Sequence, residues 1–96
     1  MGAFRVVYTS AVMRDDIPKL TRVHARRVRK AIEAKLKTDP LAYGLPLRRS
    51  LKGYWKLRVG DYRVVFRVVD DTVIVFAVLH RDVVYTLMLK RLERFL

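Results

Sequence analysis

Residues 51–68 read LKGYWKLRVGDYRVVFRV, and the rest of the chain is interpreted outward from them. On both sides of Gly60-Asp61, apolar residues alternate with basic ones, which is the period of a β-strand with one buried face. A glycine beside an aspartate between two such runs is typical of a two-residue turn. The stretch therefore predicts an antiparallel hairpin that turns at Gly60 and Asp61.

The predicted turn also fixes which residues face one another across the hairpin. The expected pairs are Val59 with Tyr62, Arg58 with Arg63, Leu57 with Val64 and Lys56 with Val65. Like charges directly opposite one another weaken strand pairing, so a hairpin selected only for stability would avoid facing arginines. An anion bound between Arg58 and Arg63 would turn this cost into a function.

Three further segments have patterns of regular structure. Phe4, Val6 and Tyr8 recur at every second position and predict a first strand. Asp70-Asp71 predicts a second turn, after which residues 73–79 are apolar on both faces, as in a central strand. The last segment, residues 84–96, is rich in leucine and methionine and predicts a C-terminal helix.

Two helices are expected between the first strand and the hairpin. Ser10 is predicted to cap a helix that begins at Ala11, and Pro18 to end or break that helix. Thr21 is predicted to cap the second helix. The core-facing stripe of the second helix consists of Ala25, Val28, Ile32 and Leu36. Residues 38–47, with an Asp-Pro pair and a glycine, are expected to form a loop.

Together these elements predict one α+β domain over residues 1–96. In this fold, a three-stranded antiparallel meander joins the N-terminal strand in one sheet. A helical hairpin separates the first strand from the meander, and a helix ends the chain. Hydrophobic residues make up 52% of the sequence, which is enough for a folded core.

The composition limits the possible partners. With 21 lysines and arginines against 9 acidic residues, the net charge is +12, which favours nucleic acid, an acidic protein or an anionic surface. There is no cysteine and there are only two histidines, so we expect no disulfide, metal site or cofactor. The start of the chain does not read as a signal peptide, and the apolar run 72–79 is too short to span a bilayer. We therefore expect a cytoplasmic protein without a membrane partner.

The order of elements and three motifs resemble the RelE/ParE superfamily of type II toxins. The motifs are LKGYWKLRVGDYRVVF (51–66), DDTVIVFAVLHRDVVY (70–85) and MRDDIPKL (13–20). RelE-like members are ribosome-dependent ribonucleases that cut messenger RNA, whereas ParE-like members inhibit DNA gyrase without cutting RNA. The resemblance also implies a cognate antitoxin that neutralises the toxin.

The resemblance to RelE-like toxins implies a catalytic site. In that family a metal-independent reaction lets the RNA 2′-hydroxyl attack the adjacent phosphate, which needs a base, positive charge and an acid. Lys56 matches the lysine that acts as base, and Arg63 matches the phosphate-stabilising arginine. Arg81 corresponds to the acid-assisting arginine, and Tyr85 to the tyrosine that orients or stacks on RNA. With Arg58 from the hairpin, the predicted catalytic residues are Lys56, Arg58, Arg63, Arg81 and Tyr85.

Other residues have two interpretations. His80 is a possible acid or base, because a histidine titrates near neutrality, or it only forms a hydrogen bond at a strand end. Tyr54 stands where RelE carries a second lysine. A further set of basic residues either binds RNA or the ribosome or forms a solvated surface. This set consists of Arg22, Arg26, Arg27, Arg29, Lys30, Lys52 and Arg67.

Three functions compete. The favoured one is a ribosome-dependent messenger RNA endoribonuclease, because Lys56, Arg58 and Arg63 occur together with Arg81 and Tyr85. The alternative is a ParE-like inhibitor of DNA gyrase with no chemistry of its own. A third is a toxin that has lost its activity and only binds its antitoxin. Tyr54 is compatible with this third function, because it replaces the second lysine of RelE.

Overall fold

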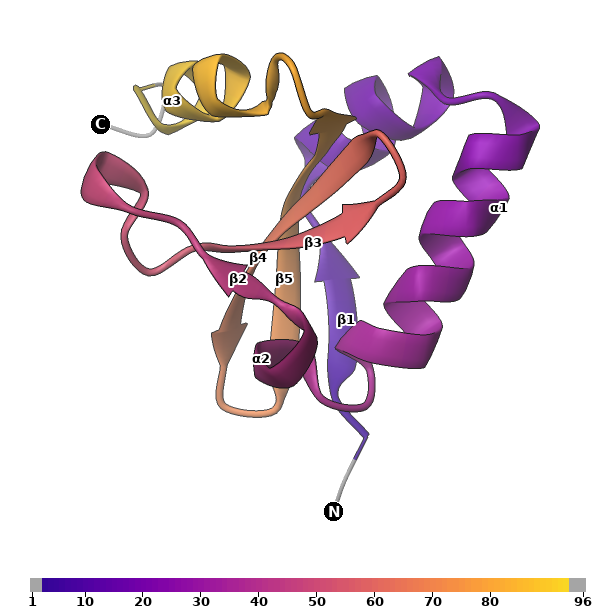
Figure 1. Ribbon diagram of the computed structural model, residues 1–96, viewed down its shortest axis with the longest axis vertical. Helices are drawn as coiled ribbons and strands as arrows, with labels where there is room; N and C mark the ends of the chain where they lie inside the picture. The colour runs from indigo at the N-terminus through magenta and orange to yellow at the C-terminus, as the bar shows by residue number, and fades with distance from the viewer. Residues whose placement is uncertain (1–2, 94–96) are drawn as a thin grey trace.

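The computed structural model describes residues 3–93 as a twisted five-stranded sheet with helices against it (Figure 1). The strands are β1 (Arg5–Tyr8), β2 (Leu45–Pro46), β3 (Trp55–Val59), β4 (Tyr62–Val69) and β5 (Thr72–His80). Their order in the sheet is β1-β5-β4-β3-β2. β1 runs parallel to β5, and the other neighbours are antiparallel. The α+β fold and the single sheet predicted from the sequence are confirmed.

The hairpin of β3 and β4 has the predicted register. Arg58 faces Arg63, Val59 faces Tyr62 and Lys56 faces Val65 across the two strands. Gly60 has a φ of 58°, a left-handed backbone conformation that glycine adopts without the steric cost that a Cβ brings. The turn chemistry and the alternation therefore agree, and the two together set the register.

The strand β5 is central, as its apolar sequence predicts, and it contains a bulge. Val65 pairs with Ala77 and Phe66 pairs with Val75, so Phe76 is the extra residue on β5. The bulge reverses the phase of the alternation along β5. Val73 and Val75 before it contact the same core as Val78 after it.

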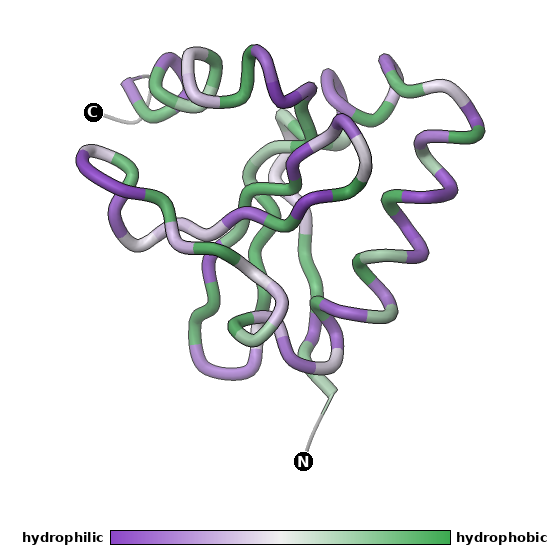
Figure 2. The backbone as a smooth tube through the Cα atoms, viewed as in Figure 1, coloured by the Kyte–Doolittle hydropathy of each residue, from purple (hydrophilic) through white to green (hydrophobic). Residues whose placement is uncertain are grey.

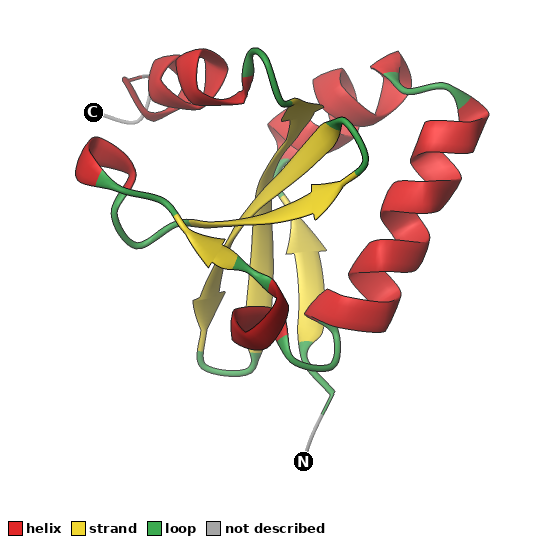
Figure 3. Ribbon diagram, in the orientation of Figure 1, coloured by secondary structure: helices red, strands yellow, loops and turns green. Residues whose placement is uncertain are grey.

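One face of the sheet is covered by α1 (Arg22–Ala31), which continues as a wider helical turn over Ile32–Leu36 (Figure 3). Thr21 caps α1 as predicted, because its Oγ1 accepts a hydrogen bond from the His24 backbone N at 3.2 Å. In the predicted core-facing stripe, Val28, Ile32 and Leu36 are buried and Ala25 is half-buried. Figure 2 shows hydrophobic and hydrophilic residues alternating along this helix, as a one-sided contact requires.

The opposite face of the sheet carries a second core beneath α3 (Val84–Glu93). Its buried members are Leu47, Leu51, Val65, Ala77, Leu79, Val84 and Met88. The predicted C-terminal helix is confirmed through Glu93, and residues 94–96 lie outside the described part. The two cores place α1 and α3 on opposite faces of the sheet, and the face under α3 is the one on which Lys56 lies opposite Val65.

Two local predictions are wrong. Residues 38–47 are not a loop, because they contain a short helix, α2 (Pro40–Tyr43), and the strand β2, in which Leu45 pairs with Lys56. Proline suits the first helical turn, and a two-residue edge strand is defined by its partner and not by its own pattern. Ser10 is not a cap, since the helix already includes it and the Met13 N bonds to the Thr9 O at 3.2 Å.

The first helical segment continues through Val12–Asp16 and then tightens at Ile17–Lys19. Pro18 lies in this tighter turn, after which the chain is extended at Leu20, so the segment ends where the proline predicts. Within residues 3–93, no helix combines the length and the apolar character that crossing a membrane requires.

Candidate functional site

The hairpin brings three of the predicted catalytic residues to one face of the sheet. Leu57 and Val64 face the core under α1, so Lys56, Arg58 and Arg63 point to the opposite face. Lys56 lies directly across from Val65, and Arg63 is its diagonal neighbour. Diagonal neighbours on one sheet face are about 7–8 Å apart, within reach of long side chains.

Lys56 is joined to Tyr85, the second residue of α3. The Lys56 Nζ donates a hydrogen bond to the Tyr85 hydroxyl at 3.0 Å, and it lies 5.3 Å from the centroid of the tyrosine ring. The two residues are 29 positions apart in sequence, and the Tyr85 side chain is 46% exposed. The structure therefore brings these two predicted residues together where solvent, or a ligand, can reach them.

Both residues line a hollow of about 530 Å³, which we call the Lys56 pocket. Its lining residues are Leu45, Pro46, Arg48, Arg49, Ser50, Leu51, Lys56, Tyr85 and Leu89. The pocket combines three cations with an apolar floor and an aromatic ring. A phosphate with an attached base or sugar has the matching chemistry.

Arg48 and Arg49 were missed by the sequence analysis. Arg49 has a φ of 58°, an uncommon conformation for a residue with a Cβ, and such conformations cluster at functional sites. An adjacent pair of arginines a short distance before the hairpin was the available signal. In a chain with 21 basic residues such a pair does not stand out, and its position depends on β2, which was not predicted.

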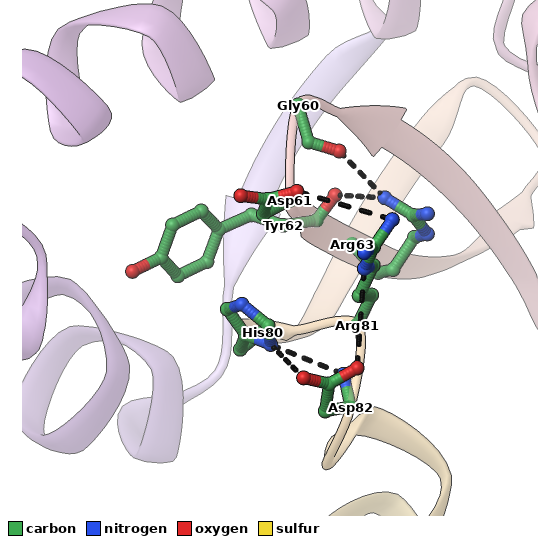
Figure 4. A network of polar contacts seen from close by, with 7 residues as sticks. All are labelled: Gly60, Asp61, Tyr62, Arg63, His80, Arg81 and Asp82. Carbon is green, nitrogen blue, oxygen red and sulfur yellow. Dashed lines mark hydrogen bonds and ion pairs between the residues drawn. The ribbon is translucent and has the colours of Figure 1, made fainter.

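The guanidinium of Arg63 points toward the hairpin turn (Figure 4). Its NH1 donates hydrogen bonds to the carbonyl oxygens of Gly60 and Tyr62, both at 2.9 Å. These bonds direct the guanidinium along the turn and offset the repulsion expected from Arg58. Neither Arg58 nor Arg63 lines the Lys56 pocket.

Arg81 lies beside the same turn. Its backbone N donates to the Asp61 O at 2.8 Å, and its guanidinium lies 4.0 Å from an Asp61 carboxylate oxygen and 3.9 Å from one of Asp82 (Figure 4). These side chains are more than half exposed, so the ion pairs contribute little to stability. Arg58, Arg63 and Arg81 together with Gly60-Asp61 form a second cationic region, which we call the hairpin tip.

His80 lies on the other face of the sheet from the pocket. It pairs with Tyr62 across the strands, and the two ring centroids are 5.7 Å apart, on the side where Tyr62 also contacts His24. Its Nδ1 accepts a hydrogen bond from the Asp82 backbone N at 3.1 Å. The structure does not bring His80 to Lys56, and its contacts fit a histidine that forms a hydrogen bond at a strand end.

The predicted RNA-binding residues are exposed but spread over two surfaces. The members on α1 are Arg22, Arg26, Arg27, Arg29 and Lys30. The guanidinium of Arg27 lies against Gly60 and so connects this row to the hairpin tip. A Cβ added to Gly60 would be only 3.2 Å from the NH2 of Arg27. Lys52 is exposed in the turn before β3, and Arg67 lies with its guanidinium carbon 5.2 Å from the Tyr54 ring.

Tyr54 belongs to the core under α3. Its ring meets that of Phe76 edge to face, with the centroids 5.2 Å apart. The tyrosine at this position therefore packs against the sheet where RelE has a second lysine. Within residues 3–93, no three side chains of histidine, aspartate or glutamate lie together in a way that could hold a metal ion.

The chain is similar to proteins of toxin–antitoxin systems. The family described as "ParE toxin of type II toxin-antitoxin system, parDE" matches residues 6–85. Toxin RelG of Mycobacterium tuberculosis is 36% identical over 84 residues, which is 85% of this chain and 95% of RelG.

Solved structures of such systems have the same fold. A chain of the RelBE2 toxin–antitoxin complex of Mycobacterium tuberculosis superimposes with a TM-score of 0.75 at 34% identity, covering 81% of this chain and 98% of that one. A chain of the archaeal RelE-RelB complex from Pyrococcus horikoshii has a TM-score of 0.65 at 23% identity, covering 82% and 96% of the two chains. At that lower identity the likeness concerns the fold alone.

Proposed function

The chain belongs to the RelE/ParE superfamily of type II toxins, and we propose that it is a RelE-type endoribonuclease that cleaves messenger RNA on the ribosome. The observation that carries the proposal is the hydrogen bond between the Lys56 Nζ and the Tyr85 hydroxyl in a cationic pocket. Two proton-exchanging groups in contact, surrounded by arginines, are suited to the cleavage of a phosphodiester.

In the proposed reaction the attacking group is the 2′-hydroxyl of the RNA itself. The 2′-oxygen forms a bond to the adjacent phosphorus, the bond from phosphorus to the 5′-oxygen breaks, and a cyclic phosphate and a 5′-hydroxyl result. Lys56, held by Tyr85, is the group we assign to the 2′-hydroxyl proton. Arg81 is assigned to donate a hydrogen bond to the leaving 5′-oxygen, which takes its proton from solvent water; the resemblance to RelE implies this assisting role.

Arg58 and Arg63 are assigned to binding of the scissile phosphate. Arg63 donates to two backbone carbonyls in the free protein, and a phosphate oxygen is a stronger, charge-assisted acceptor for the same guanidinium. We therefore propose that Arg63 exchanges its turn partners for the scissile phosphate when RNA binds. The facing Arg58 adds a second cation, and the repulsion within the pair is relieved by the bound anion.

The basic surface of α1 is assigned to the ribosome. Contacts from lysine and arginine to phosphates add affinity without sequence specificity, and they weaken strongly as salt increases. Arg27 links this surface to the hairpin tip, so one continuous cationic surface would follow an RNA backbone. The proposed setting is the cytoplasm, where the ribosome is found.

A cognate antitoxin is the second proposed partner. The structures most useful for comparison are complexes of a toxin with its antitoxin, from Mycobacterium tuberculosis and Pyrococcus horikoshii. We propose that this chain also forms a complex with an antitoxin, encoded beside it, and that this antitoxin neutralises it.

The alternative is a ParE-like inhibitor of DNA gyrase. It is favoured by one observation, the match of residues 6–85 to the family of ParE toxins. A gyrase inhibitor would act by binding, so the contact of Lys56 with Tyr85 would serve only packing.

Two assays in parallel separate these functions. In a purified translation system, the wild-type protein is expected to produce new messenger RNA ends in register with ribosome positions, and Lys56→Met to produce none. In a supercoiling assay with purified gyrase, both proteins are expected to leave the rate unchanged. Intact message together with inhibited supercoiling would overturn the nuclease proposal and establish the alternative.

A further inference from the structure

A buried ion pair holds α3 to the sheet through Asp16 and Arg91, neither of which lines the Lys56 pocket. Asp16, only 2% exposed, receives two hydrogen bonds from Arg91 of α3: NH1 donates to Oδ2 at 2.8 Å, and NH2 donates to Oδ1. The same Arg91 NH1 also donates to the Phe76 O at 2.9 Å. One guanidinium therefore connects the first helical segment, the central strand and the last turn of α3.

The ion pair lies beside β5 where that strand no longer has β1 as a neighbour, although it still pairs with β4 on its other side. β1 pairs with β5 only from Thr72 to Val75, while β5 continues to His80. Beyond this point, the Val78 N donates to the Asp16 Oδ2 at 2.8 Å, and the Phe76 O accepts from Arg91. The two side chains thus satisfy backbone groups that a longer β1 would have paired, and buried backbone groups need such partners.

Within residues 3–93, the side chains of α3 make hydrogen bonds to the rest of the protein through this pair and through Tyr85 and Lys56. Three hollows adjoin the helix: the Lys56 pocket of about 530 Å³, one of about 230 Å³ beside Met88 and Leu92, and one of about 170 Å³ beside Leu87. Burial of Val84 and Met88 attracts the helix to the sheet, but such apolar contacts are not directional. The two hydrogen bonds from the Arg91 guanidinium to the Asp16 carboxylate are directional, so they fix how the helix is rotated about its axis.

The rotation of α3 decides where Tyr85 points. Tyr85 and Leu89 are four residues apart and line the Lys56 pocket from one side of the helix. Met88 and Arg91 are three residues apart and face the sheet. A change of rotation that released Arg91 would carry the Tyr85 hydroxyl away from the Lys56 Nζ.

We propose that Asp16 and Arg91 are positioning residues, whose ion pair sets the rotation of α3 and thereby holds Tyr85 against Lys56. The effect on RNA cleavage rests on the proposed function, whereas the effect on the position of Tyr85 does not. The hydrogen bond that Arg91 donates to Asp16 raises the pKa of Arg91 above its ordinary value, so the arginine stays charged across the physiological pH range.

The test compares two double variants that each remove one acid and one base. Asp16→Asn/Arg91→Met removes the ion pair but keeps an oxygen for the Val78 N. The matched control, Asp15→Asn/Lys90→Met, changes the preceding residue on each element; Asp15 is half-exposed and Lys90 is exposed. The readout is the NMR signal of the Tyr85 ring carbon that bears the hydroxyl, in protein labelled on tyrosine and assigned with Tyr85→Phe.

In Asp16→Asn/Arg91→Met, the Tyr85 signal is expected to move to the position that it has in Lys56→Met, while the control leaves it at the wild-type position. Cleavage of ribosome-bound message is expected to fall about tenfold to a hundredfold in the first variant only, since misplacing a reacting group by about 1 Å has an effect of that order. A wild-type Tyr85 signal in the folded first variant would overturn the proposal.

Two further results keep the inferences separate. If the Tyr85 signal moves as expected but the wild-type protein cuts no message, the positioning role stands and the nuclease proposal fails. If the double variant does not fold, the positioning role is tested with Arg91→Lys, because lysine keeps the charge but cannot form the two parallel hydrogen bonds of the guanidinium. A Tyr85 signal in Arg91→Lys that matches wild type would then overturn the positioning role.

Discussion

Lys56 of the pocket and Arg58 and Arg63 of the hairpin tip point to the same sheet face, but the two regions are built differently. In the pocket, Lys56 is bonded to Tyr85, a side chain 29 residues away that tertiary packing brings to it. At the tip, Arg63 is bonded to the backbone of its own turn, one and three residues away. The pocket is therefore already assembled in the free protein, whereas the tip can exchange partners. We infer that Lys56 in the pocket determines the rate of the chemical step, and that Arg58 and Arg63 at the tip determine the affinity for the phosphate.

The largest expected effect is that of Lys56→Met. Methionine keeps much of the apolar stem but removes the group assigned to the 2′-hydroxyl proton, and loss of a general base costs about 10²–10⁴-fold in rate. Cleavage should fall by that factor at every toxin concentration, while ribosome binding is kept. Single-turnover cleavage and ribosome co-sedimentation measure the two quantities. Lys19→Met, at an exposed lysine outside both regions, is the matched control. Full cleavage by Lys56→Met would contradict the role of the pocket.

The next effect is that of Arg63→Ala. The variant loses the guanidinium assigned to the phosphate, so half-maximal cleavage should require about ten to a hundred times more toxin. It also loses two hydrogen bonds to the turn, for which we expect about 1 kcal/mol less free energy of unfolding. Cleavage titrations and urea denaturation test the two statements, with Arg5→Ala on β1 as control. A variant that is as stable as wild type would show that the hydrogen bonds from Arg63 to the turn do not contribute to the free energy of unfolding.

A smaller effect separates the two arginines that face each other. Arg58→Thr removes the like-charge pair and places a β-branched residue in a strand, each of which stabilises a sheet by a few tenths of a kcal/mol. The melting temperature should rise slightly, and the toxin concentration for half-maximal cleavage should rise severalfold. A lower melting temperature would mean that Arg58 has a stabilising partner, and that the pair is not a cost.

The smallest effects are expected on α1, outside both regions. Arg26→Ala should weaken ribosome binding slightly without changing the rate at saturation, because the residue is exposed and assigned only to phosphate contacts. The slope of log affinity against log salt should become shallower by about 0.7–0.9 for each lost contact. Arg14→Ala, an exposed arginine on the first helical segment, should leave the slope unchanged. An unchanged slope for Arg26→Ala as well would remove α1 from the proposed ribosome contact.

The difference between the two regions also explains what the sequence could predict. The register that places Arg58 opposite Arg63 follows from local turn chemistry and alternation, and it was predicted correctly. The cap at Thr21 is equally local. In contrast, residue spacing gives no indication that Lys56 contacts Tyr85. Only the resemblance to a family identified both residues. The residues between them do not determine where α3 packs, so the contact could not be predicted from the sequence.

Other features were out of reach for the same physical reason. The strand β2 exists through its pairing with β3, and the arginines before the hairpin line the pocket because of it. The bulge at Phe76 reverses the phase of β5, so alternation alone could not assign His80 to the face under α1. Asp16 and Arg91 are 75 positions apart in the sequence. A hydropathy pattern does not distinguish a charged residue that is buried in an ion pair from one that is exposed, so the pair could not be predicted.

The most direct test of the central claim is single-turnover cleavage of ribosome-bound message over a range of toxin concentrations, for wild type, Lys56→Met and Arg63→Ala. The account predicts ribosome-registered cleavage by wild type, a low plateau rate for Lys56→Met at any concentration, and a near-normal plateau for Arg63→Ala reached only at high concentration. No cleavage by wild type, or the same defect in both variants, would contradict the division of the site into a catalytic pocket and a phosphate-binding tip.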